Sequence, residues 1–156
     1  ELGFYWMTGP VPEEEYYTPF EPVVRREGRH ATLVTWFPKM VRLALDAAEE
    51  CAKNGIEVEV IDLRILNPFP REFVLESVRK TGCALILSED SGFMGFCAEI
   101  ISQIATSDTA YDLRSRIGLV AARNTPIPVH LALENARLPQ LTDVVGAIHE
   151  LWKEAQ

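Results

Sequence analysis

Several features that would fix a protein's location or partners are scarce or missing in this chain of 156 residues. No apolar run approaches the ~20 residues that a membrane-spanning helix needs, and the chain does not open with the pattern of a secretory signal peptide. Basic residues are few: 15 Lys and Arg stand against 23 Asp and Glu, for a formal net charge of −8. Because nucleic acids and anionic membranes attract basic surfaces, neither is expected as a partner. The prediction is a cytoplasmic protein, or a protein of the mitochondrial matrix in a eukaryote.

Cysteine and histidine are scarce as well, and neither residue type forms a recognisable site. The three cysteines include no C-x-x-C pair, so we expect reduced, buried thiols: Cys51, Cys83 and Cys97. The three histidines share no metal-ligand spacing with one another or with a cysteine: His30, His130 and His149. No Ser-His-Asp or Cys-His order stands out either. The sequence therefore predicts no catalytic, cofactor-binding or metal-binding residue.

The composition suits one compact domain, preceded by a short arm. Apolar residues make up 47% of the chain and charged residues 24%, which is typical of a globular protein with a real core. Residues 1–20 carry three prolines and the acidic run Glu13-Glu14-Glu15, so we expect an irregular arm or linker there. Residues 21–156 are predicted to form a single α/β domain. Because the first residue is Glu1 rather than Met, we expect the chain to be a piece of a longer protein.

Apolar patterns in residues 21–156 alternate between two periods. Nearly continuous apolar runs predict buried strands at 31–36, 56–62, 83–88 and 116–121, with a short edge strand at 23–26. Apolar residues at helical spacing predict four helices, at 39–54, 70–81, 96–107 and 142–155. This alternation predicts a three-layer α/β/α fold around a doubly wound, mostly parallel sheet.

Individual residues sharpen these boundaries. Pro38 suits the first position of a helix, Gly82 a helix end, and Thr142 an N-cap. The helix at 96–107 is expected to bury Ala98, Ile101, Ile104 and Ala105. Residues 123–139 contain three prolines and are predicted to be a long irregular crossing.

Three loops are expected at the carboxyl ends of the strands, where open α/β sheets bind ligands: residues 36–38, 63–69 and 89–95. The last of them joins Glu89, Asp90, Gly92 and Gly95 to a helix that starts at Phe96 and has Glu99 in its first turn. The carboxylates oppose an anion, so a tight turn is favoured over a phosphate site. Sequence neighbours rarely face one another, so an acid–base pair of Glu89 and Asp90 is also disfavoured.

Two further groups of residues are candidates for structural or interface positions. Asp62 and Arg64 follow the second buried strand and are expected to form a local ion pair. Glu134 and Arg137 lie in the long crossing, which is predicted to contact another subunit because long ordered loops in compact domains are often functional.

Seven segments in the same order resemble a known family. The best match is Val60-Ile61-Asp62-Leu63-Arg64-Ile65-Leu66-Asn67-Pro68; others are Val11 to Tyr16, Gly95-Phe96 with Ala98-Glu99-Ile100, and Pro126-Ile127-Pro128 with Ala132-Leu133-Glu134 and Leu138-Pro139. Together they are similar to the C-terminal domain of the beta subunit of 2-oxo acid dehydrogenases, which are transketolase-like enzymes. Met94 and Cys97 stand where that family usually has glycine, and Val129 where it often has an aromatic residue.

The resemblance implies a five-stranded sheet with one antiparallel strand, at 23–26, and a function in assembly. It implies that thiamine diphosphate and magnesium are bound by other domains of the parent enzyme, so no catalytic residue is carried over. The implied partners are other subunits or domains of the same enzyme and a small basic binding domain of the acyltransferase component. The acidic balance of the chain agrees with that last partner.

Two alternatives stay open at this point. The chain could be the equivalent domain of another transketolase-like enzyme, such as transketolase or deoxyxylulose-phosphate synthase, although Val11 to Tyr16 favours the first interpretation. It could also be a free-standing α/β module that binds a small molecule. Against that module, Trp36-Phe37-Pro38-Lys39 occupies the place of a glycine-rich phosphate loop.

Overall fold

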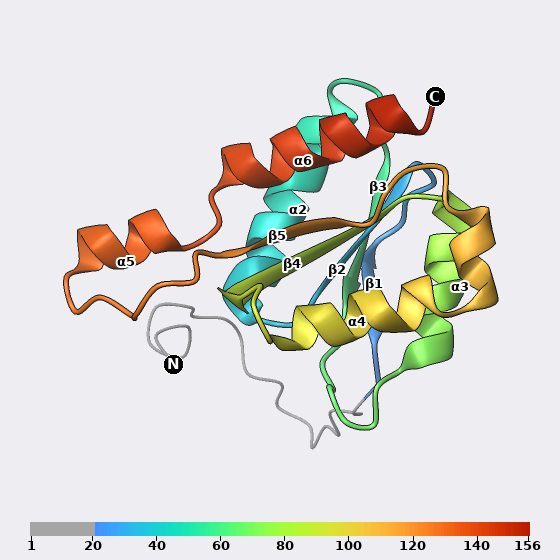
Figure 1. Cartoon of the computed structure of the whole chain (residues 1–156). Helices are drawn as coiled ribbons and strands as arrows, with labels where there is room; N and C mark the ends of the chain where they lie inside the picture. Colours follow the sequence, from blue (N-terminus) through green and yellow to red (C-terminus); the bar gives the residue numbers. More distant parts are fainter. Residues whose placement is uncertain (1–20) are drawn as a thin grey trace, which may run out of the picture.

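A computed structural model describes residues 21–156 of the chain, so the arm predicted for residues 1–20 lies outside the described part. Five strands form one sheet in the order β1-β3-β2-β4-β5 (Figure 1). The strands are β1 (Val23–Arg26), β2 (Ala31–Thr35), β3 (Val58–Asp62), β4 (Ala84–Ser91) and β5 (Gly118–Ala122). The helices are α2 (Pro38–Ala52), α3 (Arg71–Thr81), α4 (Phe96–Ala105), α5 (Leu131–Arg137) and α6 (Leu141–Glu154), with a 3-10 turn, η1 (Asp108–Asp112).

The sheet is mixed in the way the resemblance implied. Strands β2, β3, β4 and β5 are parallel, whereas β1 pairs antiparallel with the outer side of β3. The chain passes from β2 to β3 on one side and then returns to β4 on the other side of β2. The point between β2 and β4 is therefore the topological switch of the sheet.

Helices cover both faces of the sheet and make three layers (Figure 1). On one face, α2 and α6 pack over a core that includes Leu33, Val60 and Leu87. On the other face, α3 and α4 pack over Val34, Ile61 and Ile86. Consecutive residues of β2 and β3 thus alternate between two apolar cores, which explains the continuous apolar runs in the sequence. Among the described residues, no helix is long and apolar enough to cross a membrane.

Two of the predicted helix boundaries are confirmed and one is wrong. Pro38 begins α2, and Gly82 ends α3 in the left-handed conformation, with φ of 67°. The N-cap of α6 is Gln140 rather than Thr142. Gln140 and Asp143 form a capping box, in which each side chain accepts a hydrogen bond from the backbone N–H of the other residue. These N–H groups lie in the first turn of α6 and have no partner within the helix.

Three other expectations are corrected. Residues 89–91 are not a loop, because β4 continues through Ser91. Helix α4 buries Cys97, Ile100 and Ile104, while Ala98 and Ala105 are exposed, so its inner face is rotated from the predicted one. Residues 123–139 are not wholly irregular, because α5 forms between Pro128 and Pro139.

Candidate functional site

The carboxyl ends of the parallel strands bring the predicted loops together at one edge of the sheet. The segments after β2, β3, β4 and β5 leave the sheet there. In an open α/β sheet this edge is the usual ligand site, with the switch point between β2 and β4 at its centre.

At the switch point, aromatic rings occupy the space. The Trp36 ring meets the Phe96 ring edge-on, with centroids 5.5 Å apart, and Phe96 meets Phe69 in the same manner at 5.9 Å. All three side chains are half-buried against the core under α3 and α4. Pro38 at the start of α2 has no N–H to offer an anion. Apolar contacts therefore fill the switch point between β2 and β4, and a nucleotide phosphate at this point is disfavoured.

The turn from β4 into α4 is tight, as predicted. A Cβ at Gly95 would lie 2.2 Å from the main-chain oxygen of Ser91, so only glycine fits there. The Ser91 hydroxyl accepts the Phe93 N–H at 3.1 Å and lies 3.2 Å from the Asn124 side-chain oxygen, which ties the turn to the segment after β5. Met94 takes φ of 55°, a conformation that favours glycine. Gly92 lies against Leu119 of the edge strand β5.

The carboxylates of this edge do not form a catalytic pair. Glu89 is half-buried and Asp90 is exposed, and both lie where the register between β4 and β5 shifts. Burial raises the pKa of Glu89, and the negative charges of Asp90 and Glu134 add to this while Lys39 opposes it. Glu99 is exposed in the first turn of α4 and accepts a hydrogen bond from Gln103 at 2.7 Å. These side chains assemble no nucleophile or general base.

Asp62 does not pair with Arg64. Its Oδ2 instead accepts two hydrogen bonds from Arg25, from Nε at 3.0 Å and from Nη2 at 2.7 Å. Arg64 takes a left-handed backbone conformation, with φ of 57°, in the connection from β3 to α3. The Asp62 carboxylate therefore joins β3 to the edge strand β1, a link between residues 37 positions apart.

Residues 123–140 form the most unusual surface of this edge, and we call them the α5 arm. Figure 1 shows α5 standing away from the sheet and from the other helices, and it buries none of its residues. Hydrogen bonds close the base of the arm: Arg123 N donates to the Arg137 carbonyl at 3.1 Å, and Arg137 Nε donates to that of Thr125 at 3.3 Å. Gln140 donates to two carbonyls at the end of α5. The arm is thus held in shape without a core of its own.

Apolar side chains on the arm and on the neighbouring turn point into solvent. Val129 is fully exposed and Met94 is 87% exposed. The other members of this apolar surface are Phe93, Ile127, Leu131 and Leu133. An isolated seven-residue helix is not stable in water, and an exposed apolar group of this kind marks an interaction site. The exposed apolar side chains of the arm and the turn are therefore the candidate functional site, and the predicted residues Glu134 and Arg137 lie in the same arm.

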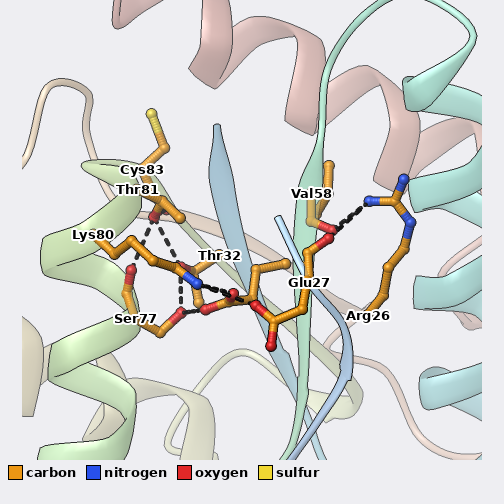
Figure 2. Close-up of polar contacts among 9 residues, drawn as sticks. Arg26, Glu27, Thr32, Val58, Ser77, Lys80, Thr81 and Cys83 are labelled. Atoms are coloured by element: carbon orange, nitrogen blue, oxygen red, sulfur yellow. Dashed lines mark hydrogen bonds and ion pairs between the residues drawn. The ribbon is translucent and has the colours of Figure 1, made fainter. Parts of the chain in front are cut away.

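A buried polar cluster ties α3 to the sheet at the opposite, amino-terminal end of the strands (Figure 2). Glu59 of β3, 1% exposed, accepts hydrogen bonds from Ser77 and Lys80 of α3. The Ser77 hydroxyl is hydrogen-bonded to the Thr32 hydroxyl at 2.7 Å, and the Thr32 hydroxyl to the Thr81 hydroxyl at 2.8 Å. Every polar group here has a partner within the cluster, which is the pattern of a structural link.

Reasoning from the sequence missed the exposed apolar residues of the arm. The signal was present, because six of the seven residues from Leu131 to Arg137 are strong helix formers and the segment lies between two prolines, but the prolines dominated the interpretation. The cysteine prediction is confirmed: all three thiols are buried and unpaired, and burial raises the pKa of Cys51 to about 11. Within residues 21–156, no three His, Cys, Asp or Glu side chains gather as a metal site would require.

Comparisons with known proteins give a consistent result. The family model for the transketolase C-terminal domain matches residues 21–144. The chain is 35% identical over 152 residues to the beta subunit of an acetoin:2,6-dichlorophenolindophenol oxidoreductase of Cupriavidus necator, with 97% of this chain and 44% of that protein aligned. It is 36% identical over 148 residues to the mitochondrial pyruvate dehydrogenase E1 component subunit beta-1 of Arabidopsis thaliana, covering 92% of this chain and 40% of that one.

A third relative and a solved structure extend the pattern. The pyruvate dehydrogenase E1 component subunit beta of Rickettsia felis is 37% identical over 148 residues, with 94% of this chain and 45% of that subunit aligned. A solved structure named as a split gene transketolase, an inactive beta4 tetramer, superimposes with a TM-score of 0.72 at 25% identity, covering 94% of this chain and 46% of that one. The chain thus spans about half the length of these relatives.

Proposed function

Because the chain belongs to the transketolase C-terminal domain family, we propose that it is the assembly domain of the beta subunit of a 2-oxo acid dehydrogenase. The parent enzyme would decarboxylate a 2-oxo acid with thiamine diphosphate and pass the acyl group to a lipoyl carrier. The relatives named as pyruvate and acetoin enzymes support this proposal. A single domain, residues 21–156, would follow an N-terminal linker, residues 1–20.

Residues 21–156 do not fit thiamine diphosphate or its magnesium ion. A diphosphate needs N–H or cationic donors, whereas Trp36 and Phe96 close the switch point and Asp90 is a negative charge beside it. A magnesium ion needs gathered oxygen ligands, and among residues 21–156 no three His, Cys, Asp or Glu side chains come together. We propose that both groups bind to the rest of the parent enzyme.

The observation that carries the assembly proposal is the apolar surface of the α5 arm. Its base is fixed by hydrogen bonds between Arg123, Thr125 and Arg137, so it loses little entropy on binding. Its tip presents Val129 and Leu131 to solvent. Burying such side chains against another subunit would gain about 1.5–3 kcal/mol each. We propose that this surface packs against another subunit or domain of the same enzyme.

Acidic groups beside the arm support a basic second partner. Asp90 and Glu134 lie close enough to Glu89 for their charges to act on its carboxylate, on a chain with a net charge of −8. Complementary charge steers association and selects partners. We propose that the small basic binding domain of the acyltransferase component docks at this edge.

The proposal is tested by placing charge on the tip of the arm. Val129→Asp and Leu131→Asp should each prevent stable association with the subunit encoded beside this chain, because a buried unpaired carboxylate is costly. Tyr111→Asp, on the equally exposed turn η1 at the other end of β5, is the matched control and should leave association intact. Light-scattering mass checks the complex, and a circular dichroism melt checks the fold. An arm variant that still assembles would contradict the assembly surface.

A second candidate is the corresponding domain of transketolase itself or of another transketolase-like enzyme. The solved relative named as a transketolase favours it. In that case the assembled protein would transfer a two-carbon ketol unit rather than decarboxylate a 2-oxo acid. Activity assays of the complex with both substrate classes separate the two candidates.

A further inference from the structure

A cavity of about 380 Å³ lies between the edge strand β1 and helix α2, at the carboxyl ends of β2 and β3. Its walls are apolar on most sides, because Trp36 follows β2 and Pro38, Val41 and Leu45 stand along the first turns of α2. The volume falls near the lower end of the range of cavities that bury a ligand, roughly 300–1,000 Å³. A small organic molecule therefore suits it better than a nucleotide cofactor.

Asp62 forms the polar end of this cavity. Its side chain is only 9% exposed, and both hydrogen bonds that it accepts within residues 21–156 come from Arg25 and go to Oδ2. Each oxygen of a carboxylate can accept more than one hydrogen bond, and a buried acceptor without a donor costs free energy. An O–H or N–H group inside the cavity would supply the donor that Asp62 Oδ1 lacks among the described residues.

The charges around the cavity cancel in pairs. Arg25 neutralises Asp62, with Nη2 at 2.7 Å from Oδ2, and Arg42 pairs with Asp46 at 3.1 Å. A charged ligand would lose its hydration here without meeting an unpaired opposite charge. An uncharged O–H or N–H gains a hydrogen bond to an ionised acceptor, which is stronger than a bond between neutral groups. The cavity therefore favours an uncharged ligand with an apolar body and a hydrogen-bond donor.

We propose that this cavity is a binding site for a small uncharged alcohol or amide with an aromatic or branched apolar body. The body lies among Trp36, Val41 and Leu45, and the O–H or N–H donates to Asp62 Oδ1. Trp36 both lines the cavity and meets Phe96 edge-on at the switch point, so its indole reports whether the cavity is occupied. The proposal does not depend on the proposed function, because it follows from the cavity alone.

NMR of the indole N–H groups tests the site during titration of the full chain with benzyl alcohol. The chain has three tryptophans, Trp6, Trp36 and Trp152, and single Trp→Phe variants assign their signals. The Trp36 signal should shift and then saturate. The Trp152 signal should not shift, because Trp152 lies at the other end of the strands, stacked on His30 with ring centroids 4.5 Å apart.

Three related compounds separate the hydrogen-bond donor from the ring. Toluene has the ring and no polar group, benzyl methyl ether can accept but not donate, and benzoate carries a charge. Benzyl alcohol should bind about tenfold more tightly than toluene or the ether, the factor expected for one net hydrogen bond to a charged acceptor. Benzoate should bind no more tightly than toluene. An ether that binds as tightly as the alcohol would overturn the role of Asp62 as the acceptor.

Filling the cavity gives an independent test. Val41→Phe places a ring in the cavity and should abolish the response of Trp36 to benzyl alcohol. Leu43→Phe is the matched control, because Leu43 is also half-buried on α2 and is not among the residues around the cavity, so it should leave the response unchanged. A circular dichroism melt checks that both variants fold, and Leu45→Phe replaces Val41→Phe if that variant does not. The proposal is overturned if Trp36 does not respond in the native chain, if Trp152 responds in its place, or if a folded, filled variant still binds.

Discussion

The ion pair between Glu59 and Lys80 allows the sharpest test of how this fold is held together. The Glu59 side chain is 2% exposed, whereas that of Lys80 is 47% exposed at the end of α3. Ser77 donates to one carboxylate oxygen and Lys80 to the other (Figure 2). A hydroxyl has one proton, so Thr32 donates to Ser77 and Thr81 to Thr32. The whole chain of hydrogen bonds therefore ends on the carboxylate that Lys80 neutralises.

Lys80→Met should destabilise the domain far more than the loss of an ordinary surface lysine. Removing one partner of a fully buried pair costs about 3–5 kcal/mol, and breaking an exposed pair costs at most about 1 kcal/mol. Because Lys80 is half-exposed, water will partly replace its ammonium, and we expect about 2–3 kcal/mol. For a chain of this size that corresponds to a drop in melting temperature of roughly 5–10 °C.

The pH dependence of the loss has a definite sign. The hydrogen bond to Glu59 raises the pKa of Lys80 above its usual value of 10.5. A raised lysine pKa gives stability that is complete below pH 10.5 and is lost as the pH rises through the pKa of the folded state. The difference between the native chain and Lys80→Met should therefore be constant near neutral pH and shrink in strong alkali.

The interaction free energy of this pair is measured by urea denaturation of four chains: the native chain, Lys80→Met, Glu59→Gln and the double variant. A double-mutant cycle isolates the coupling, and the double variant should recover most of the stability that Lys80→Met loses. Lys53→Met is the matched control, since Lys53 pairs with Glu50 on the open surface of α2, and its midpoint should not move. A loss under about 1 kcal/mol for Lys80→Met, or a coupling of zero, would refute the reasoning.

Three further substitutions test the turn after β4 and the charge beside it, with a fourth, Gly146→Ala in α6, as a comparison. Gly95→Ala places a Cβ 2.2 Å from the Ser91 oxygen and should lower the free energy of unfolding, measured with urea, by about 1–3 kcal/mol. Gly146→Ala has open space around it in α6 and should raise the free energy of unfolding by about 0.5–1 kcal/mol. Met94→Gly removes the strain of a side chain on a left-handed backbone, so it should raise the melting temperature and the free energy of unfolding, the latter by about 1 kcal/mol. An unchanged melting temperature would show that Met94 is not strained. Burial raises the pKa of Glu89 above 4.5, so its ionisation destabilises the fold as the pH rises; Glu89→Gln should therefore be the more stable chain at pH 7 and lose that advantage below pH 4.5.

Most of the sheet could be predicted from the sequence because its strands and helices differ sharply in period. In β2 and β3 every residue is buried, so the sequence shows short apolar runs that only a two-sided sheet explains. Helix α2 was placed to within two residues at each end by its apolar spacing, Pro38 and Gly55. Such local patterns are set by the chain itself, and the fold follows from them.

Prediction from local sequence patterns failed for side chains whose partners lie far away in the sequence. Helix α4 is apolar on more than one side, so the sequence did not show that Ile100 faces the core rather than Ala98. Asp62 was assigned to Arg64 because they are neighbours, but β1 brings Arg25 to it across the sheet. No role was predicted for Glu59, because an acidic residue in a strand does not indicate that Ser77 and Lys80 of α3 will pair with it.

The sequence predicted which residues form the candidate surface, but not that part of it is a helix. Residues 123–139 were expected to contact another subunit, and their exposed apolar side chains are consistent with that expectation. Their helix was missed because three prolines outweighed a segment in which six of seven residues are strong helix formers. Pro128 and Pro139 lie outside α5, where they limit it without breaking it.

The central claim is that this chain assembles a 2-oxo acid dehydrogenase, and one measurement tests it most directly. Light-scattering mass is recorded for the chain alone and with the protein encoded beside it or upstream of Glu1, followed by an assay for thiamine-dependent 2-oxo acid decarboxylation. The account predicts no turnover by the chain alone, and a stable complex that decarboxylates. A chain that stays a monomer with those partners, or that binds thiamine diphosphate and turns over by itself, would contradict it.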